Sequence, residues 1–201
     1  YGVVFENGPG QRVILNPNKK QYEITLDPLG IEHLADPGDI VKCLEATEKY
    51  PANDLGIIAL AKQAVGKAET SKDRVNNLAE FVADYVDEIQ VNREQNVHET
   101  IVLRKGDCTE HAELFVAMAR AIGIPARTVG GLHFLKGNDF TGHMWCEVVL
   151  EGSWIPVDPT LPQFPIDALH IRFPTNKARS YANMKAIQDM RIEILDIGYG
   201  E

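Results

Sequence analysis

The order of the periodic segments constrains the fold of this 201-residue chain more than any other feature. Between about residues 55 and 122 the apolar residues recur every three or four positions, which predicts three amphipathic helices. From residue 125 onward they alternate with polar residues or form short runs between turn residues, which predicts strands. Because the helices come first and hairpin-linked strands follow, we expect an α+β fold with an antiparallel sheet.

The third predicted helix begins with a capping box. Asp107 stands where the N-cap side chain is needed, and Glu110 stands three residues later. Gly123 and Pro125 follow the last apolar residue of this segment, in the order that commonly ends a helix. Cys108 is therefore expected in the first turn, where unpaired backbone N–H groups and the positive end of the helix dipole lie.

A tight hairpin is predicted further along the chain. The strand patterns at 142–150 and 153–158 are separated by two residues, which is the commonest hairpin connection. This loop length makes His143 and Asp158 diagonal neighbours on one face, about 7–8 Å apart. A loop longer by one residue would put them on opposite faces. The register therefore allows a hydrogen bond between the two side chains.

Together, Cys108, His143 and Asp158 are typical of a nucleophilic acyl-transfer site. A helix N-terminus and a nearby imidazolium both stabilise a thiolate, which is the nucleophilic form of cysteine. His143 would take the thiol proton and later give it to the leaving amine, while Asp158 would orient the ring. Backbone N–H groups at the start of the helix would stabilise the oxyanion.

Each of these residues also has an ordinary interpretation. A lone helical cysteine is often a small buried apolar residue, and an aspartate before proline often forms a turn. His111, on the same helix as Cys108, is an alternative base and otherwise a packing residue. A metal site made of Cys108, His111 and His143 is a further alternative. Since the sequence has no CxxC motif and no zinc-type Cys/His spacing, we expect neither a metal nor a cofactor.

The three cysteines do not form a disulfide framework, because their number is odd and their spacing irregular. Cys146 falls on the strand face opposite His143, so we expect it in the core, and Cys43 has no evident partner. Arg127 is expected to pair with Glu110 or Glu113. Four further histidines have no sequence context that assigns them a role: His33, His98, His133 and His170.

Two tryptophans share the strand face of His143. We expect Trp154 in the core, whereas Trp145 is either a core residue or the wall of a substrate cleft.

The composition of the chain limits the kinds of molecule that it is expected to bind. The net charge is -9, and no cluster of Lys and Arg stands out, which argues against a nucleic-acid-binding face or an anionic-membrane patch. No apolar run approaches the roughly 18 residues of a membrane span. The chain starts with Tyr1 rather than Met, which suggests an excised or processed piece.

Residues 1–54 form an N-terminal extension, or the tail of a preceding region, in this interpretation. It contains two predicted strands, at 12–15 and 21–26. Residues 55–201 form the catalytic domain, with a further strand expected at 167–173, a helix at 177–190 and a closing strand at 191–197.

Four segments in the same order resemble the transglutaminase-like superfamily, in particular its bacterial and archaeal members. They are residues 105–112 (KGDCTEHA), 120–127 (RAIGIPAR), 142–147 (GHMWCE) and 152–160 (GSWIPVDPT). The resemblance implies a papain-like α+β fold, in which the nucleophile helix packs on an antiparallel sheet or barrel. It also implies a Cys-His-Asp triad, which Cys108, His143 and Asp158 match.

The resemblance further implies a cysteine protease or amide hydrolase that acts on a protein or peptide through a thioester. Protein cross-linking is the alternative activity, and a catalytically silent binding or scaffold domain is another. Family members often assist the oxyanion with an upstream side chain, for which Tyr85 or Gln90 is the candidate here. The bacterial resemblance favours the cell envelope or a secreted location, while the sequence leaves the oligomeric state open.

Overall fold

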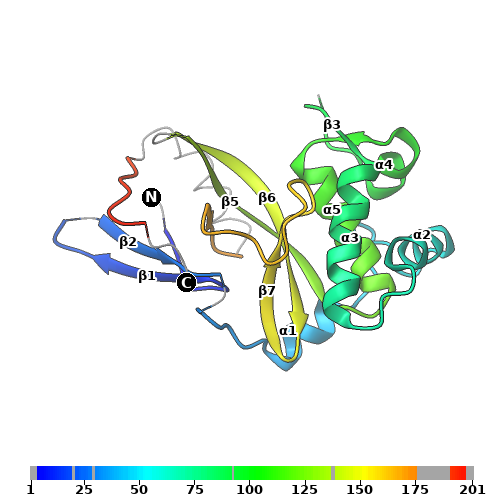
Figure 1. The fold of residues 1–201 in the computed structure, drawn as a ribbon, viewed down its shortest axis with the longest axis horizontal. Coiled ribbons are helices and arrows are strands. Elements are labelled where there is room, and N and C mark those ends of the chain that lie inside the picture. Colours follow the sequence, from blue (N-terminus) through cyan, green and yellow to red (C-terminus); the bar gives the residue numbers. More distant parts are fainter. Residues whose placement is uncertain are drawn as a thin grey trace.

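The computed structural model describes residues 4–19, 21–28, 30–91, 93–136, 139–175 and 191–197. Helices cover one side of a curled antiparallel sheet, and a two-stranded hairpin lies toward the other side (Figure 1). That hairpin consists of β1 (Gln11–Asn16) and β2 (Gln21–Leu26), which confirms the two strands expected near the N-terminus. The fold class is therefore α+β, as the order of the sequence patterns indicates.

The three predicted helices are present as α2 (Leu55–Val65), α3 (Ser71–Tyr85) and α5 (Cys108–Ala121). Two short helices were not predicted, α1 (Pro37–Lys42) and α4 (Val97–Leu103). The apolar stripes of α2, α3 and α5 pack against one another, and α5 also packs against the main sheet. Buried members of this core include Ile57, Leu78, Val82, Phe115, Met118, Cys146 and Val148.

The start of α5 is built as the sequence predicts. The Asp107 carboxylate accepts a hydrogen bond from the Thr109 N–H at 2.8 Å, and Glu110 accepts one from the Asp107 N–H at 2.9 Å. Gly106, in the short strand β4 (Lys105–Gly106), is required here, because a Cβ at this position would lie 2.3 Å from Glu110 Cβ. β4 pairs in parallel with β3 (Asp87–Glu88).

The main sheet has the strand order β7–β6–β5–β8, and every neighbouring pair is antiparallel. Its strands are β5 (Ala126–Lys136), β6 (Asp139–Leu150), β7 (Ser153–Val157) and β8 (His170–Arg172). Leu150 pairs with Ser153, which confirms the predicted register of the hairpin between β6 and β7. The strand expected at 167–173 is present but shorter, and it pairs with β5.

Two structural predictions are wrong. Residues 191–197 form no strand; only Ile192 packs against the small core around Phe173, and the remaining side chains point into solvent. Arg127 pairs with Glu147 at 2.7 Å rather than with a glutamate of α5, because the β5–β6 register places these two residues directly opposite each other. The helix expected at 177–190 lies outside the described residues.

Parts of the first 54 residues contact the sheet and α5. The Trp154 N–H donates to the His33 carbonyl at 2.9 Å, and the Tyr50 hydroxyl lies 2.9 Å from Thr128 Oγ1. Lys49 pairs with Glu113 of α5 at 2.6 Å. Whether these residues are an extension of the domain or belong to a preceding region stays a prediction.

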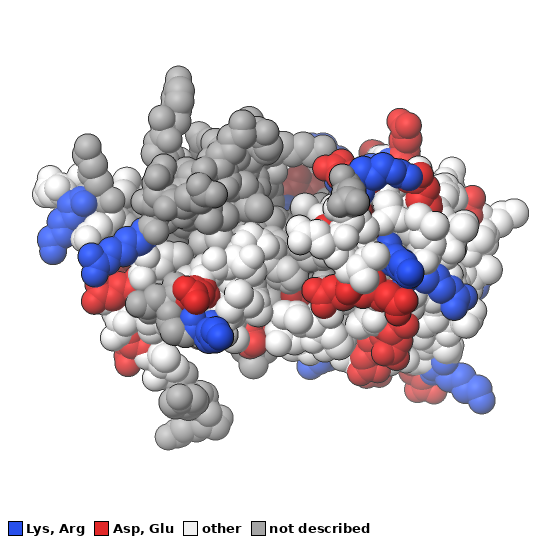
Figure 2. All heavy atoms as spheres, turned by 90° about the horizontal axis from the view of Figure 1, so that it is seen from above, with Lys and Arg blue, Asp and Glu red and all other residues white. Residues whose placement is uncertain are grey.

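The surface carries charges of both signs. On the face shown in Figure 2, basic side chains stand among acidic and uncharged ones rather than forming one continuous area. Within the described part of the chain, no helix is both long enough and apolar enough to cross a bilayer.

Candidate active site

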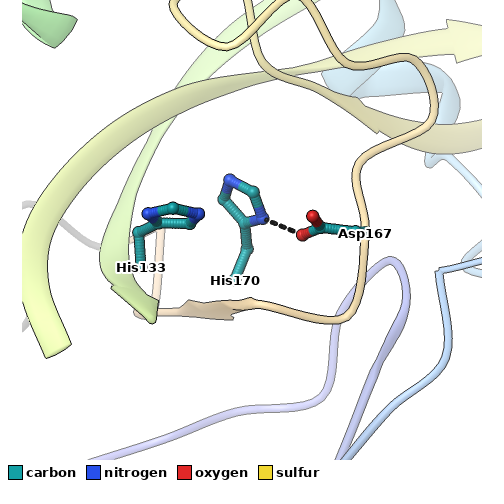
Figure 3. A group of neighbouring side chains, drawn as sticks. All are labelled: His133, Asp167 and His170. Atoms are coloured by element: carbon teal, nitrogen blue, oxygen red, sulfur yellow. Dashed lines mark hydrogen bonds and ion pairs between the residues drawn. The ribbon is translucent and has the colours of Figure 1, made fainter. Parts of the chain in front are cut away.

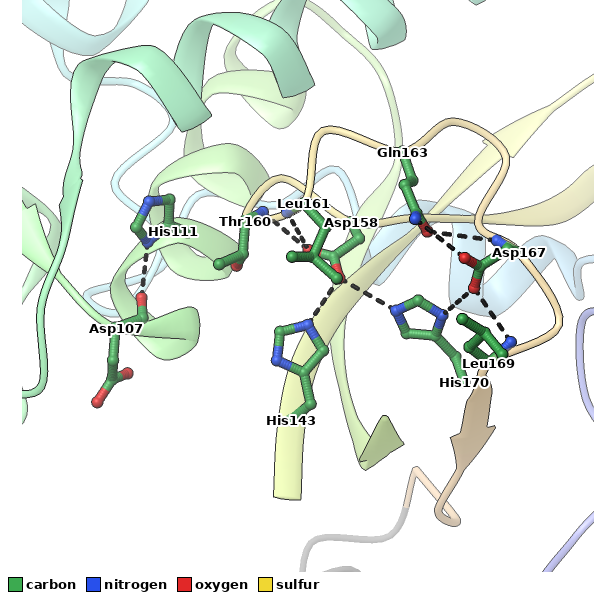
Figure 4. A network of polar contacts seen from close by, with 10 residues as sticks. All are labelled: Asp107, His111, His143, Asp158, Thr160, Leu161, Gln163, Asp167, Leu169 and His170. Atoms are coloured by element: carbon green, nitrogen blue, oxygen red, sulfur yellow. Dashed lines mark hydrogen bonds and ion pairs between the residues drawn. The ribbon is translucent and has the colours of Figure 1, made fainter. Parts of the chain in front are cut away.

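The hairpin between β6 and β7 brings His143 and Asp158 into direct contact. His143 Nε2 lies 2.6 Å from Asp158 Oδ2, and the Asp158 side chain is fully buried. Asp158 follows the last residue of β7, in a turn closed by paired backbone bonds to Gln163. The other carboxylate oxygen, Oδ1, accepts the N–H groups of Thr160 at 2.8 Å and Leu161 at 3.2 Å (Figure 4). The carboxylate is thus fixed on both sides.

A second histidine, His170, also contacts this carboxylate. Its Nε2 lies 3.1 Å from Asp158 Oδ2, and its Nδ1 lies 3.1 Å from Asp167 Oδ1 (Figure 4). Its side chain is fully buried. Sequence reasoning missed this residue because its position depends on the pairing of β8 with β5, which joins segments far apart in the chain. A weak signal was available: His170 and Asp167 lie three residues apart beside a predicted strand.

The charges of Asp158 and His143 stabilise each other. Burial raises the pKa of the Asp158 carboxyl, but hydrogen bonds from His143 and His170 outweigh it and hold the pKa well below its usual range. Burial likewise lowers the pKa of His143, but hydrogen bonds to Asp158 and Cys108 reverse the effect and raise it to about 9. The pair therefore consists of a carboxylate and an imidazolium at neutral pH.

Cys108 is the first residue of α5 and is partly exposed, unlike the two other cysteines. Its side chain lies close to the His143 imidazole and, against the effect of burial, helps to raise the pKa of that ring. The structure thus brings together the three residues that the sequence singled out. Cys146 is buried, as predicted, with its thiol 3.3 Å from the Ala112 carbonyl, and burial raises its pKa well above the ordinary value. Cys43 is also buried.

His111 is directed elsewhere. Its Nδ1 lies 2.8 Å from the Asp107 carbonyl oxygen (Figure 4). Its Nε2 lies 3.0 Å from the Val86 carbonyl oxygen, so both ring nitrogens face backbone acceptors. This arrangement favours its alternative role as a packing residue at the start of α5. Neither His111 nor Cys108 belongs to the metal-ligand-type clusters among the described residues.

Trp145 lies beneath the site rather than at its mouth. It is almost fully buried, and its ring stacks on that of His143, with the centroids 6.2 Å apart. Gly131 allows this packing, since a Cβ there would lie 2.3 Å from the Trp145 ring. Trp154 is also buried, as predicted, with the Arg127 guanidinium 3.8 Å from its ring centroid.

The two candidates for a side-chain oxyanion donor gain little support. The Tyr85 hydroxyl donates to the Ile101 carbonyl at 3.1 Å, and the Tyr85 ring stacks on Phe81. Gln90 is exposed, and its role stays a prediction.

The α+β fold and the arrangement at the start of α5 are those expected for the transglutaminase-like superfamily. Comparison with known sequences leads to the same superfamily. The sequence profile of the transglutaminase-like superfamily matches residues 58–159, about half of the chain, and the chain belongs to this superfamily. The matched segment includes Cys108, His143 and Asp158.

Among individual proteins, the chain is similar to human kyphoscoliosis peptidase. The two are 28% identical over 131 residues, which are 59% of this chain and 20% of that protein. A Cytophaga hutchinsonii structure described as a candidate cysteine protease is 27% identical and has a TM-score of 0.57; the match covers 74% of this chain and 50% of that chain. The chain thus spans about a fifth of the human relative and half of the bacterial one.

The periplasmic domain of TgpA from Pseudomonas aeruginosa shares the fold. It is 22% identical, with a TM-score of 0.53 over 70% of this chain and 54% of that chain. These comparisons agree with the papain-like, transglutaminase-like architecture implied by the sequence segments.

Proposed function

We propose that this chain hydrolyses a carboxamide or peptide bond in a protein or peptide through a thioester on Cys108. The observation that carries the proposal is the imidazole of His143, which lies 2.6 Å from a buried carboxylate and close to the thiol at the start of α5. Because Nε2 is used by Asp158, Nδ1 is the nitrogen that would exchange a proton with the thiol. Asp158 orients the ring and stabilises its protonated form.

The reaction has two halves. The thiolate of Cys108, whose proton His143 already holds, attacks the carbonyl carbon; the C–N bond then breaks, and the leaving amine takes that proton from His143. In the second half, His143 removes a proton from water, and the resulting hydroxide adds to the thioester carbon. The C–S bond breaks and the carboxylic acid leaves, which restores the Cys108 thiolate and the protonated His143.

The oxyanion of each tetrahedral intermediate needs a donor in the first turn of α5. The Thr109 N–H is already donated to the Asp107 carboxylate at 2.8 Å. The N–H of Cys108 itself is therefore our candidate, supported by the dipole of a 14-residue helix.

Hydrolysis is favoured over cross-linking because the human relative is named a peptidase and the Cytophaga hutchinsonii structure is described as a candidate protease. The two activities share every step up to the thioester and differ only in the acceptor. The test offers a glutamine-containing protein substrate with and without a fluorescent primary amine, and separates the products by mass spectrometry. Hydrolysis predominates in our proposal even with the amine present; a predominantly amine-labelled product would show cross-linking instead.

Matched variants make this test specific. Cys108→Ala should abolish product formation, whereas Cys43→Ala should leave it unchanged, because Cys43 is buried against Trp154 and Val149 in a separate small core. Equal activity of the Cys108→Ala protein would refute the proposal. Absence of any thioester on the wild-type protein across a broad set of peptide and amide substrates would favour a silent binding domain.

A further inference from the structure

Three histidines from neighbouring strands meet on the sheet face that carries His143. The β5–β8 register places His133 directly opposite His170, and the β5–β6 register places His143 two residues away, opposite Gly131. The ring centroids of His133 and His170 are 4.6 Å apart, and that of His143 lies 5.5 Å and 5.8 Å from them. The proposed reaction uses only one of these three imidazoles.

Two of the rings form a cluster with Asp167. Ligand-type atoms of His133, Asp167 and His170 all lie within 4.8 Å of one another. Figure 3 shows the His133 ring beside that of His170, with Asp167 on the far side and bonded to His170. His170 Nδ1 and Asp167 Oδ1 are 3.1 Å apart. Two ligands of a tetrahedral zinc ion, each about 2.0–2.1 Å from the metal, are separated by about 3.3 Å. The pair is therefore already spaced for a shared ion.

The surroundings hold these ligands in place. His170 presents Nδ1 to the cluster while its other nitrogen is 3.1 Å from the Asp158 carboxylate, the arrangement that fixes the tautomer and orientation of metal-binding histidines. The second oxygen of Asp167 accepts a hydrogen bond from Gln163 Nε2 at 3.0 Å. Both would-be ligands are thus oriented from outside the cluster, as in established metal sites.

Access from solvent also suits a metal. The Asp167 side chain is 40% exposed, so an ion has a path from solvent and a water can complete the coordination.

We propose that His133, Asp167 and His170 Nδ1 bind one divalent zinc-type ion, with water as the fourth ligand. The mixture of imidazole and carboxylate ligands suits zinc rather than calcium or magnesium, which prefer oxygen ligands. Binding replaces the proton that His170 Nδ1 otherwise shares with Asp167, and this proton is released to solvent. Because His170 contacts Asp158, the ion would be connected to the proposed triad by one hydrogen bond. The proposal itself does not depend on the activity of Cys108.

The test is zinc binding by the full chain after treatment with a chelator and dialysis. Isothermal titration with zinc chloride at neutral pH should show a single ion per chain, and zinc should raise the thermal midpoint. Asp167→Ala, at a partly exposed position, and His133→Ala should each weaken binding by about tenfold or more. His98→Ala is the matched control, because His98 lies 3.5 Å from Asp54 in an exposed pair; it should bind zinc as the wild type does.

The Cys108 thiol is the main alternative site for zinc binding. Two measurements distinguish it from the proposed cluster of His133, Asp167 and His170. Cys108→Ala should retain full zinc affinity, and the cobalt-substituted protein should show no thiolate-to-metal charge-transfer absorption. No measurable binding by the folded wild type would overturn the proposal. Binding that is lost in Cys108→Ala but unchanged in Asp167→Ala and His133→Ala would overturn it equally. In either case His170 and Asp167 form an ordinary hydrogen-bonded pair.

Discussion

Replacing Asp158 with asparagine should change how the stability of the protein depends on pH. The substitution preserves the size of the side chain but removes the charge that lies 2.6 Å from His143 Nε2. Both proteins should carry Cys108→Ala, so that ionisation of this thiol does not enter the comparison. In the Asp158→Asn variant, the His143 imidazolium loses the main interaction that offsets the unfavourable effect of its burial.

The magnitude follows from the pKa of His143, which is raised to about 9 in the folded protein. The ordinary value is about 6.5, and each unit corresponds to about 1.36 kcal/mol, so the interactions are worth about 3 kcal/mol in total. Cys108 supplies part of this net effect while burial opposes it, so about 3 kcal/mol is the order of magnitude expected for the Asp158 contribution. A raised pKa stabilises the folded state fully below pH 6.5, and this stabilisation is lost as the pH rises through about 9.

The assay is urea unfolding of both proteins at several pH values between 6 and 10, with the free energy of unfolding compared at each. The free energy for the protein that retains Asp158 should fall relative to that of Asp158→Asn between pH 6.5 and 9, by about 3 kcal/mol. His98→Ala is the control and should follow its parent, since the His98–Asp54 pair is exposed. Parallel curves for the parent protein and its Asp158→Asn variant would refute the reasoning.

Three other expectations follow from the packing. Gly106→Ala should lower the free energy of unfolding by about 1–3 kcal/mol, because the new methyl group would lie 2.3 Å from Glu110 Cβ; urea titration measures it. Glu147→Gln should cost about 3–5 kcal/mol in the same assay, because the buried Arg172 guanidinium, 3.0 Å away, loses its carboxylate. His170→Phe should slow alkylation of the nucleophile several-fold in a protein that remains folded, and His170→Gln, which keeps an N–H donor, should partly restore the rate.

Much of the fold could be predicted from local sequence patterns. The capping box at Asp107 and Glu110 and the two-residue loop before Ser153 depend only on neighbours in the chain, and both are present as expected. The contact between His143 and Asp158 follows from that loop, since the register alone decides which side chains share a face. Local sequence patterns therefore predict the positions of most residues in the candidate site.

The features that could not be predicted depend on pairing between distant segments. Arg127 was assigned to the wrong glutamate because the β5–β6 register, and not the helix, supplies its partner. His170 reaches Asp158 only because β8 joins the free edge of β5. Residues 191–197 have an apolar pattern suited to a strand, but a strand also needs a partner edge, and a single-segment pattern does not reveal one.

The most direct test of the central claim is the rate at which iodoacetamide alkylates Cys108 at pH 7, measured by mass spectrometry of the intact protein and of its peptides. The arrangement of the helix terminus, His143 and Asp158 requires alkylation faster than that of free cysteine, and a marked slowing in His143→Ala. A rate equal to that of free cysteine and unaffected by His143→Ala would contradict the account.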